Sequence, residues 1–567
     1  MSTQIPTDDP TRGVTLATSP AGALLEAATL ARWANELFSA VPGGEASRAA
    51  APSVPIPGAP VAGGSMPSPP SAPWLPTADT AVTGATPDFQ SFAALVHAVL
   101  PRLDARDLTH PALPSVPLVG QSFAAQPTNL DTASARAPAF YFLQDRGIPS
   151  LPRGHGHPAF DVHSIRRDFP ILATQVHGRP LVWFDNAATT QKPNVVIDRL
   201  SYFYRNENSN IHRAAHELAA RATDAYEGAR RQVQRFLGAA SADEIVFVRG
   251  ATEAINLVAQ SWGRKYVSAG DEILVSHLEH HANIVPWQML ALERGAHLRV
   301  APVDSSGQLR LDEFQRLLTE HTKIVSIAHV SNALGTVTPV KEVIELAHRA
   351  GATVLIDGAQ SVSHMTIDVK ALGADFFVLS GHKVFGPTGI GVLYGRQSVL
   401  EEMPPWQGGG NMIEDVTFER SLYQHPPTRF EAGTGNIADA VGLGAALEYL
   451  TTIGMPNIER YEAQLLSYAT EGLLTVPGLK IIGTAAHKAS VLSFVIEGLE
   501  PTAIGSALNQ EGIAVRAGHH CAQPILRRFG HESTVRASLA LYNTCEEVDA
   551  LIHALHQLTA SPTKAYR

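Results

Sequence analysis

Short apolar runs separated by longer amphipathic stretches dominate the chain from about residue 161 onward. The runs lie at 244–248, 272–276, 323–328, 353–357, 376–379 and 391–394. A short run that is apolar throughout is typical of a strand buried on both faces, and strands that alternate with helices form largely parallel sheets. The pattern therefore predicts an α/β fold whose ligands bind beyond the carboxyl ends of the strands.

The pattern changes after about residue 450. A long helix is expected at 456–474, followed by strands such as 491–496 and by helices at 501–511 and 545–558. Helices and strands without regular alternation predict a smaller α+β unit. We therefore expect a large domain at 159–450 and a small C-terminal domain at 451–567.

The first 158 residues have a different composition. They contain 23 of the 39 prolines, 8 arginines, 11 acidic residues and no lysine. Such a segment buries too little apolar surface to offset its chain entropy. The composition predicts a largely disordered arm with extended polyproline stretches.

Four apolar islands interrupt this arm, at 19–38, 73–76, 86–103 and 140–143. The third repeats its apolar residues at three- and four-residue steps, as an amphipathic helix does. One interpretation is that the islands pack on the protein's own body or have no role. The other is that the arm is a tether whose islands bind another protein, so that several weak contacts add through effective concentration.

Charge, cysteine content and hydropathy argue against several classes of protein. The formal net charge of -10 does not favour a nucleic-acid partner. Cys521 and Cys545 are the only cysteines, so we expect a reducing compartment rather than a disulfide framework. No apolar run reaches the roughly 18 residues of a membrane span, and the acidic N-terminus does not resemble a secretory signal. We expect a cytoplasmic protein with no membrane partner.

Three residues at expected strand ends carry candidate chemistry. Lys383, in Ser380-Gly381-His382-Lys383, can form a Schiff base with an aldehyde if it is partly out of water, although an isolated lysine on a turn is more often a surface residue. Asp357 can pair with a pyridinium nitrogen or cap a helix. His280 can stack on a ring or move protons. We expect no metal site, because no third ligand is spaced with the paired histidines.

Further candidates lie in loops. Thr252 follows Arg249-Gly250-Ala251 at the expected start of a helix, where backbone N–H groups and a hydroxyl can bind phosphate. Cys521 lies in Arg516-Ala517-Gly518-His519-His520-Cys521, where cationic neighbours favour a nucleophilic thiolate. Arg536 is a candidate clamp for a carboxylate. Cys545, at an expected helix start, is expected to be an inert thiol.

Several motifs in order resemble the group II cysteine desulfurases of the SufS type, which are fold-type I enzymes that use pyridoxal 5′-phosphate (PLP). The matching stretches are Glu279-His280-His281-Ala282-Asn283, Asp357-Gly358-Ala359-Gln360, Ser380-Gly381-His382-Lys383 and Arg516-Ala517-Gly518-His519-His520-Cys521-Ala522. The resemblance covers roughly residues 161–560. It implies a mostly parallel seven-stranded sheet, a homodimer, and conversion of L-cysteine to L-alanine.

The resemblance also implies a role for each matching residue. Lys383 forms the internal aldimine, Asp357 pairs with the pyridine nitrogen, and Gln360 and His280 contact the ring. Cys521 is the nucleophile that receives the sulfur as a persulfide, so Cys521, Lys383 and His280 are the expected catalytic residues. The other implied contacts are with the phosphate, by Ala251, Thr252, Ser380, His382 and, across the dimer, Thr434, and with the substrate, by Asn332, Arg516, Arg536, His212 and Arg213.

Two features depart from the family's pattern. Ala251 stands in the phosphate turn, where a second threonine is common. The larger departure is the arm, which resembles that of desulfurases carried as cargo by family 2 encapsulin shells. That resemblance implies loading into a shell through residues 1–150 and a role in sulfur storage. The alternative is a housekeeping desulfurase or selenocysteine lyase that passes sulfur to an acceptor protein for iron–sulfur cluster assembly.

Overall fold

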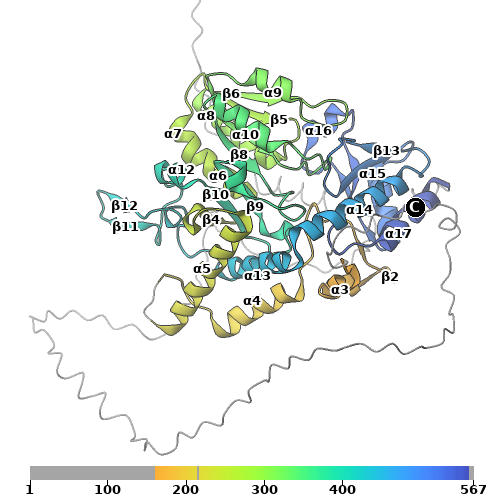
Figure 1. Ribbon diagram of the computed structural model, residues 1–567, viewed down its shortest axis with the longest axis horizontal. Coiled ribbons are helices and arrows are strands. Elements are labelled where there is room, and N and C mark those ends of the chain that lie inside the picture. Colours follow the sequence, from red (N-terminus) through yellow and green to blue (C-terminus); the bar gives the residue numbers. More distant parts are fainter. Residues whose placement is uncertain (1–159, 213–215, 561–567) are drawn as a thin grey trace, which may run out of the picture. The chain divides into compact units, whose positions relative to one another are not determined.

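The computed structural model describes residues 160–212 and 216–560 (Figure 1). By its internal contacts the chain divides into residues 1–144 and 145–567, and every described residue belongs to the second unit. The arm and islands predicted within residues 1–158 lie outside the described residues, as does Arg213. The predicted division at residue 450 stays a prediction.

A seven-stranded sheet forms the centre of the described unit. Its strand order is β4-β10-β9-β8-β7-β5-β6. The strands are β4 (Ile245–Val248), β5 (Glu272–Ser276), β6 (His297–Ala301), β7 (Thr322–Ala328), β8 (Thr353–Asp357), β9 (Phe376–Ser380) and β10 (Gly391–Gly395). Neighbours from β9 to β6 are parallel, whereas β10 is antiparallel to both β4 and β9. The prediction of a mostly parallel α/β sheet is confirmed.

Alternate residues of each strand enter different cores. In β9, Phe377 and Leu379 join one apolar cluster, while Phe376 and Val378 join the other. Side chains alternate across a strand, so a strand covered on both faces has to be apolar at every position. This explains why the sequence shows continuous apolar runs.

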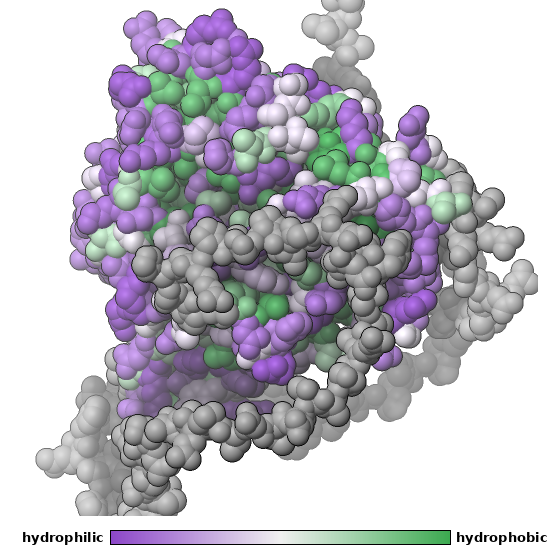
Figure 2. All heavy atoms as spheres, turned by 45° about the vertical axis from the view of Figure 1, so that its right-hand side comes forward, coloured by the Kyte–Doolittle hydropathy of each residue, from purple (hydrophilic) through white to green (hydrophobic). Residues whose placement is uncertain are grey.

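Helices cover both faces of the sheet (Figure 1). The first cluster includes α4 (Asn194–Asn206), α5 (Glu217–Leu237), α9 (Leu311–Leu317), α10 (Val340–Arg349) and α13 (Ile437–Ile453). The second includes α6 (Ala251–Val258), η4 (Ala259–Gly263), α8 (Val285–Arg294) and α12 (Gln397–Glu402). On the face drawn in Figure 2, polar residues dominate and apolar ones form smaller patches.

A second, four-stranded antiparallel sheet follows in the chain. Its order is β13-β14-β17-β16, with β13 at Leu479–Ile482, β14 at Val491–Ile496, β16 at Arg516–Gly518 and β17 at Thr534–Ser538. The helices α14 (Met455–Leu473), α15 (Pro501–Gln510) and α17 (Cys545–Ala560) share a third apolar cluster with it. α16 (Gln523–Arg528) contributes to a fourth.

An early segment of the chain joins this later part. β3 (Val182–Trp183) pairs in parallel with β15 (Ile513–Ala514), and Asp185 bridges to Ser538 at the end of β17. The segment after β3 is therefore held beside residues more than 300 positions later.

The remaining elements are short. They are α3 (Val162–Arg167), η2 (Pro170–Ala173), β1 (Gln175–Val176), β2 (Arg179–Pro180), η3 (Ala242–Glu244), α7 (Arg264–Tyr266), η5 (His281–Asn283), α11 (Val369–Leu372), η6 (Gly381–Lys383), β11 (Ile413–Val416), β12 (Ser421–Tyr423) and η7 (Thr428–Phe430). Within residues 160–212 and 216–560, no helix is both long and apolar enough to cross a membrane.

Candidate active site

Most of the predicted functional side chains meet at one cavity beside the carboxyl ends of the parallel strands. The cavity has a volume of about 240 Å³. Twelve predicted residues line it: Ala251, Thr252, His280, Asn332, Asp357, Gln360, Ser380, His382, Lys383, Arg516, Cys521 and Arg536. Parallel strands end at a common edge, which brings residues that are far apart in the chain together there.

Lys383 lies in η6, directly after β9. The chain turns sharply at Gly381, where a Cβ atom would lie 2.8 Å from Ile390 Cγ2 and 3.0 Å from the carbonyl oxygens of Ile390 and Pro387. Only glycine fits this close approach of backbone segments without displacing them. The turn places the lysine in the wall of the cavity.

The peptide group before the lysine is held firmly. The His382 carbonyl accepts hydrogen bonds from the Thr190 N–H and the Thr189 hydroxyl, both at 3.0 Å. Burial lowers the pKa of Lys383 to about 8, although the charge of Asp357 opposes this shift. Lys383 therefore loses its proton, and becomes a nucleophilic amine, at a lower pH than an exposed lysine does.

Asp357 ends β8 and is buried at the bottom of the same cavity. Its Oδ1 accepts a hydrogen bond of 2.9 Å from the Ala359 N–H. Desolvation raises the pKa of Asp357, while that hydrogen bond and the charge of Lys383 oppose the shift. Gln360 also lines the cavity, and its Nε2 donates to the Ala187 carbonyl at 2.6 Å.

His280 rests on a buried polar network. Its Nδ1 accepts from the Ala282 N–H at 3.0 Å, which leaves the proton of the neutral ring on Nε2. Burial lowers the pKa of His280 to about 3, and the charge of Lys383 adds to this shift. Beneath it, Glu279 accepts from Asn283 Nδ2 at 2.6 Å and from the Ala328 N–H at 2.9 Å. The ring is therefore neutral and fixed.

A backbone cradle lies on another side of the cavity, where α6 begins. Gly250 precedes the helix and packs against β10, because a Cβ on Gly391 would lie 2.4 Å from Gly250 Cα. The Ala251 N–H donates to Ser380 Oγ at 2.9 Å, and Thr252 lines the cavity beside them. An anion there would meet the positive end of a helix and two hydroxyl groups.

Cys521 lies on a constrained loop. His520 and Cys521 both have φ of 54°, a left-handed conformation that costs roughly 1–2 kcal/mol per residue unless the surroundings enforce it. The Cys521 carbonyl accepts from the His281 N–H at 2.8 Å. The His520 carbonyl accepts from Asn332 Nδ2 at 2.6 Å, and the Cys521 N–H donates to His519 Nδ1 at 3.0 Å. These bonds hold the thiol at the cavity.

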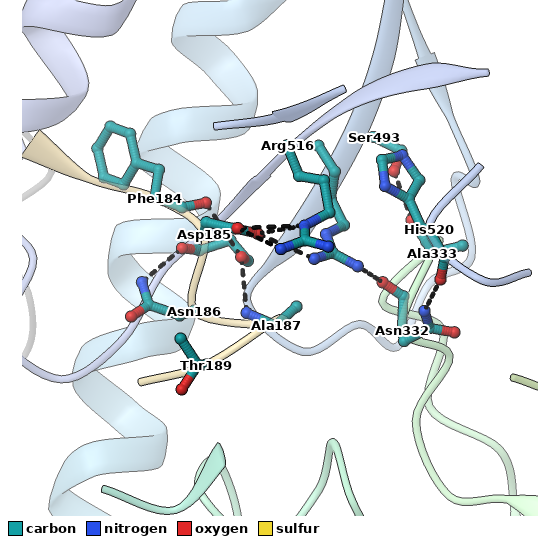
Figure 3. A network of polar contacts seen from close by, with 12 residues as sticks. Phe184, Asp185, Asn186, Ala187, Thr189, Asn332, Ala333, Ser493, Arg516 and His520 are labelled. Carbon is teal, nitrogen blue, oxygen red and sulfur yellow. Dashed lines mark hydrogen bonds and ion pairs between the residues drawn. The ribbon is translucent and has the colours of Figure 1, made fainter. Parts of the chain in front are cut away.

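Two arginines lie beside this loop and share one carboxylate (Figure 3). Arg516 contacts both oxygens of Asp185, with Nε at 3.2 and 3.1 Å and Nη2 at 3.0 Å. Arg536 reaches Asp185 Oδ1 at 3.1 Å through Nη2 and the Asn332 carbonyl at 2.9 Å through Nη1. Arg536 Nε and Asn332 Oδ1 are buried and have no partner among the residues that the structure describes.

Two predicted residues that the structure describes, His212 and Thr434, do not line this cavity. His212 contacts Glu227 Oε1 at 3.0 Å, and that hydrogen bond raises the pKa of His212. Arg213 lies outside the described residues. Thr434 is exposed and lines a different cavity, of about 450 Å³. The predicted role of Thr434 requires a second subunit, so a single chain leaves that prediction untested.

Three charged residues that matter for this geometry were not predicted from the sequence. Asp185 bonds to both arginines. Glu279, next to His280 in the chain, accepts from Asn283 and Ala328, and Glu431 binds Arg230. The only signal in the sequence was a charge directly after or within an apolar stretch, and such charges are also common at helix starts and on surfaces. The partners of Asp185 and Glu431 lie too far along the chain to be inferred from spacing.

A family model described as aminotransferase class-V matches residues 182–551. The chain belongs to the class-V aminotransferase family. The matched segment includes the seven-stranded and four-stranded sheets and every residue that lines the cavity.

Several proteins named as cysteine desulfurases or probable cysteine desulfurases are similar to this chain. A cysteine desulfurase of Synechococcus elongatus is 68% identical over 418 residues, which cover 73% of this chain and 67% of the relative. A protein of Mycolicibacterium paratuberculosis named "Probable cysteine desulfurase" is 60% identical over 472 residues, 83% of this chain and 68% of the relative. The solved cysteine desulfurase CsdA of Escherichia coli is 39% identical with a TM-score of 0.67, covering 71% of this chain and 99% of its own.

Enzymes of this class use PLP as cofactor, and the cavity of this chain fits it. Lys383 supplies an amine with a lowered pKa for the aldehyde. The carboxylate of Asp357 is buried, and a cationic ring nitrogen would offset the cost of burying its charge. The cradle at Gly250 leaves backbone donors for the phosphate. Residues that carry these three features line one cavity, so a single bound ring can meet all of them.

Proposed function

We propose that this chain is a PLP-dependent cysteine desulfurase of the SufS type, which converts L-cysteine to L-alanine and keeps the sulfur on Cys521. The observation that carries the proposal is that a cysteine lines the same cavity as Lys383, Asp357 and His280. A PLP site alone suits many reactions. A thiol on a constrained loop beside it is what a sulfur-accepting reaction requires.

In this proposal, Lys383 binds the cofactor covalently, Asp357 pairs with its ring nitrogen, and Gln360 and His280 contact the ring. Ala251, Thr252, Ser380 and His382 bind its phosphate. When bound, PLP withdraws electrons from the α-carbon of the amino acid and so weakens the bond between Cβ and sulfur. The His280 ring is neutral in this site, because burial, with the charge of Lys383 adding to it, lowers the pKa of His280 to about 3.

The substrate carboxylate binds at Arg516, Arg536 and Asn332. Support comes from Arg536, which is 2% exposed and yet keeps its buried Nε unpaired within residues 160–212 and 216–560. A buried unpaired donor costs about 1–3 kcal/mol. A carboxylate at that position would recover this cost through a charge-assisted hydrogen bond.

The atoms and electrons of the sulfur transfer balance with the thiolate, the substrate and one proton. The Cys521 thiolate attacks the sulfur of the substrate, a sulfur–sulfur bond forms and the carbon–sulfur bond breaks. The carbon skeleton takes up a proton and leaves as L-alanine, and Cys521 is left as a persulfide. Lys383 can carry that proton on Nζ, because its pKa of about 8 lets it exist in both forms near neutral pH.

The test uses purified enzyme loaded with PLP, with alanine release from L-cysteine as the measurement. Cys521→Ala is expected to abolish persulfide formation and to lower alanine release by at least about 100-fold, in the range expected for loss of a nucleophile. Cys545→Ala is the matched control, since Cys545 is exposed at the start of α17, and it should keep full activity. Full activity of Cys521→Ala would refute the proposal.

We also propose that the enzyme is a homodimer in which Thr434 reaches the partner subunit's cofactor. Its exposure at the mouth of a separate cavity supports this, because a threonine that serves its own subunit would lie near Lys383. Thr434→Ala should then weaken PLP binding only in the dimer. A protein that is monomeric by sedimentation and fully active would contradict it.

For residues 1–150 we propose loading into an encapsulin shell in the cytoplasm, with sulfur storage as the role. The Pro/Ala-rich composition supports a tether. The alignment with the M. paratuberculosis relative extends into the arm, because its 472 residues are more than the segment 160–567 contains. Deleting 1–150 should preserve turnover and abolish co-assembly with a co-expressed shell protein. Loading without the arm, or co-purification with a small sulfur-acceptor protein and no shell, would favour iron–sulfur assembly or selenocysteine lyase activity instead.

A further inference from the structure

Asp185 is the common partner of the two arginines at the substrate side of the cavity (Figure 3). It accepts a two-pronged contact from Arg516 and a further hydrogen bond of 3.1 Å from Arg536. Asp185 is buried and is not among the residues that line the cavity. It therefore lies behind the arginines and acts on a ligand only through them.

The fold holds Asp185 in this position independently of the arginines. It follows β3, its backbone bridges to Ser538, and the neighbouring Phe184 carbonyl accepts the Ser538 N–H at 2.7 Å. The Ala187 N–H donates to Ser538 Oγ at 2.9 Å. The backbone around Asp185 is thus held to Ser538 by contacts that do not involve the two arginines.

The three charged groups of this contact add to a single positive charge. Arg516 and Arg536 carry one each, and Asp185 neutralises one of them. Burial lowers the pKa of Arg536 to about 10, and the negative charge of Asp185 opposes that shift and keeps the guanidinium protonated. Arg536 Nε and Asn332 Oδ1, which find no partner in the described part of the chain, lie at the same place. One free positive charge with one open donor matches one carboxylate.

We propose that Asp185 is a positioning residue that limits the site to amino acids with a single anionic group. This rests on the proposed function, because it assumes that Arg516 and Arg536 bind the substrate carboxylate. With Asp185 present, Nε and Nη2 of Arg516 and Nη2 of Arg536 bond to an internal carboxylate, which leaves Nη1 of Arg516 and Nε of Arg536 for the substrate. Without it, these donors are free, and a second anionic group on the ligand can take its place.

The experiment compares L-alanine with L-aspartate, which is L-alanine with a second carboxylate attached to Cβ. Each is titrated into PLP-loaded enzyme, and binding is followed by the absorption of the cofactor rather than by turnover. The wild-type enzyme should favour L-alanine. Asp185→Asn should raise the affinity for L-aspartate relative to L-alanine by about tenfold or more. The side-chain carboxylate of L-aspartate can then pair with the arginine donors that Asp185 occupies in the wild-type enzyme.

Three variants serve as comparisons. Asp185→Glu restores the charge and should return the ratio towards the wild-type value. Glu272→Gln is the matched control, because Glu272 is another buried acid that pairs with an arginine, Arg299. Glu272 is the first residue of β5, whereas the cavity lies beside the carboxyl ends of the strands. Glu272→Gln should leave the ratio unchanged. In Arg516→Gln, Asp185 neutralises Arg536 alone, so the affinity for L-aspartate relative to L-alanine should fall. This variant keeps the test valid if Asp185→Asn does not fold.

A purely structural role for Asp185 predicts a different result. Both affinities would then fall together in Asp185→Asn, the aspartate-to-alanine ratio would stay at its wild-type value, and the proposal would be overturned. An unchanged ratio in Arg516→Gln would overturn it as well. Failure of the proposed function is recognised separately, because the wild-type enzyme would then release no alanine from L-cysteine.

Discussion

Replacing Glu431 with glutamine would leave the guanidinium of Arg230 buried without its counter-charge. The side chains of Arg230 and Glu431 are 2% and 6% exposed, and they make paired contacts of 2.7 and 2.9 Å. Glu431 also accepts from the Tyr226 hydroxyl at 3.0 Å and from the Phe247 N–H at 2.8 Å. Burial alone would lower the pKa of Arg230, but the charge of Glu431 reverses this and raises it well above its ordinary value.

The expected cost follows from this burial. Removing one partner of a buried ion pair costs about 3–5 kcal/mol, because the other charge stays desolvated. Glu227 contacts Arg230 at 2.9 Å but is itself partly exposed, so it offsets only part of the loss. With an unfolding entropy of about 2.1 cal/mol/K per residue over roughly 400 residues, 3–5 kcal/mol corresponds to a fall in Tm of about 4–6 °C.

The measurement is the Tm of Glu431→Gln by calorimetry, together with its PLP content. Glu217→Gln is the matched control, because it breaks an exposed pair with Arg221 on the same helix as Arg230. A surface pair of this kind is worth about 0.5 kcal/mol or less. Glu431→Gln should also release cofactor more readily, since Glu431 lies in the segment that leads to Thr434.

A double variant separates desolvation from lost packing. In the Arg230→Met background the buried charge is gone, so Glu431→Gln should cost much less than it does alone. If Glu431→Gln destabilises the protein no more than Glu217→Gln does, the ion pair contributes nothing and the reasoning from burial is wrong.

Three further predictions concern titration and the lysine turn. Burial lowers the pKa of His329 to about 4, below the value of about 6.5 in an unfolded chain. Between these two values the unfolded state binds a proton that the folded state does not, so the free energy of unfolding falls as pH drops from about 6.5 to about 4. In urea titrations, the free energy of unfolding of His329→Gln should fall less steeply over this pH range. Because the pKa of Lys383 is about 8, the rate at which apoenzyme recombines with PLP should rise as pH passes through about 8 and level off above it, and a flat absorbance-detected profile would contradict this. Lys192 Nζ donates to the Thr190 and His382 carbonyls. Lys192→Met should therefore weaken PLP binding by about tenfold, as expected for a lost charge-assisted hydrogen bond, whereas Lys192→Arg should keep most of the affinity. Equal losses of affinity in both variants would show that the hydrogen-bond donor is not what matters.

The strands and the turn that carries Lys383 could be predicted from the sequence, because their signals are local. A strand buried on both faces has to be apolar at every position, and the run 376–379 shows this directly. Asp357, His280 and Lys383 follow such runs, so their common position at one sheet edge followed from the parallel topology alone.

The arrangement around Cys521 could not be predicted in this way. The left-handed backbone at His520 and Cys521 is imposed by hydrogen bonds from His281 and Asn332, which lie about 190–240 positions earlier. No local propensity favours that conformation for these residues. The same is true of Glu431 and Arg230, whose burial depends on how α5 packs against the loop that follows β12.

By itself, the sequence determined the fold class and the set of chemical groups in the site, since strand and turn signals and the motifs around Lys383 and Cys521 are contiguous. Only the tertiary structure decided how those groups are charged and aimed. Asp185 meets Arg516 and Arg536 across 331 and 351 positions of the chain. Such a contact depends on β3 pairing with β15 and on Asp185 bridging to Ser538, and therefore on strand pairing between distant segments rather than on any neighbouring residue.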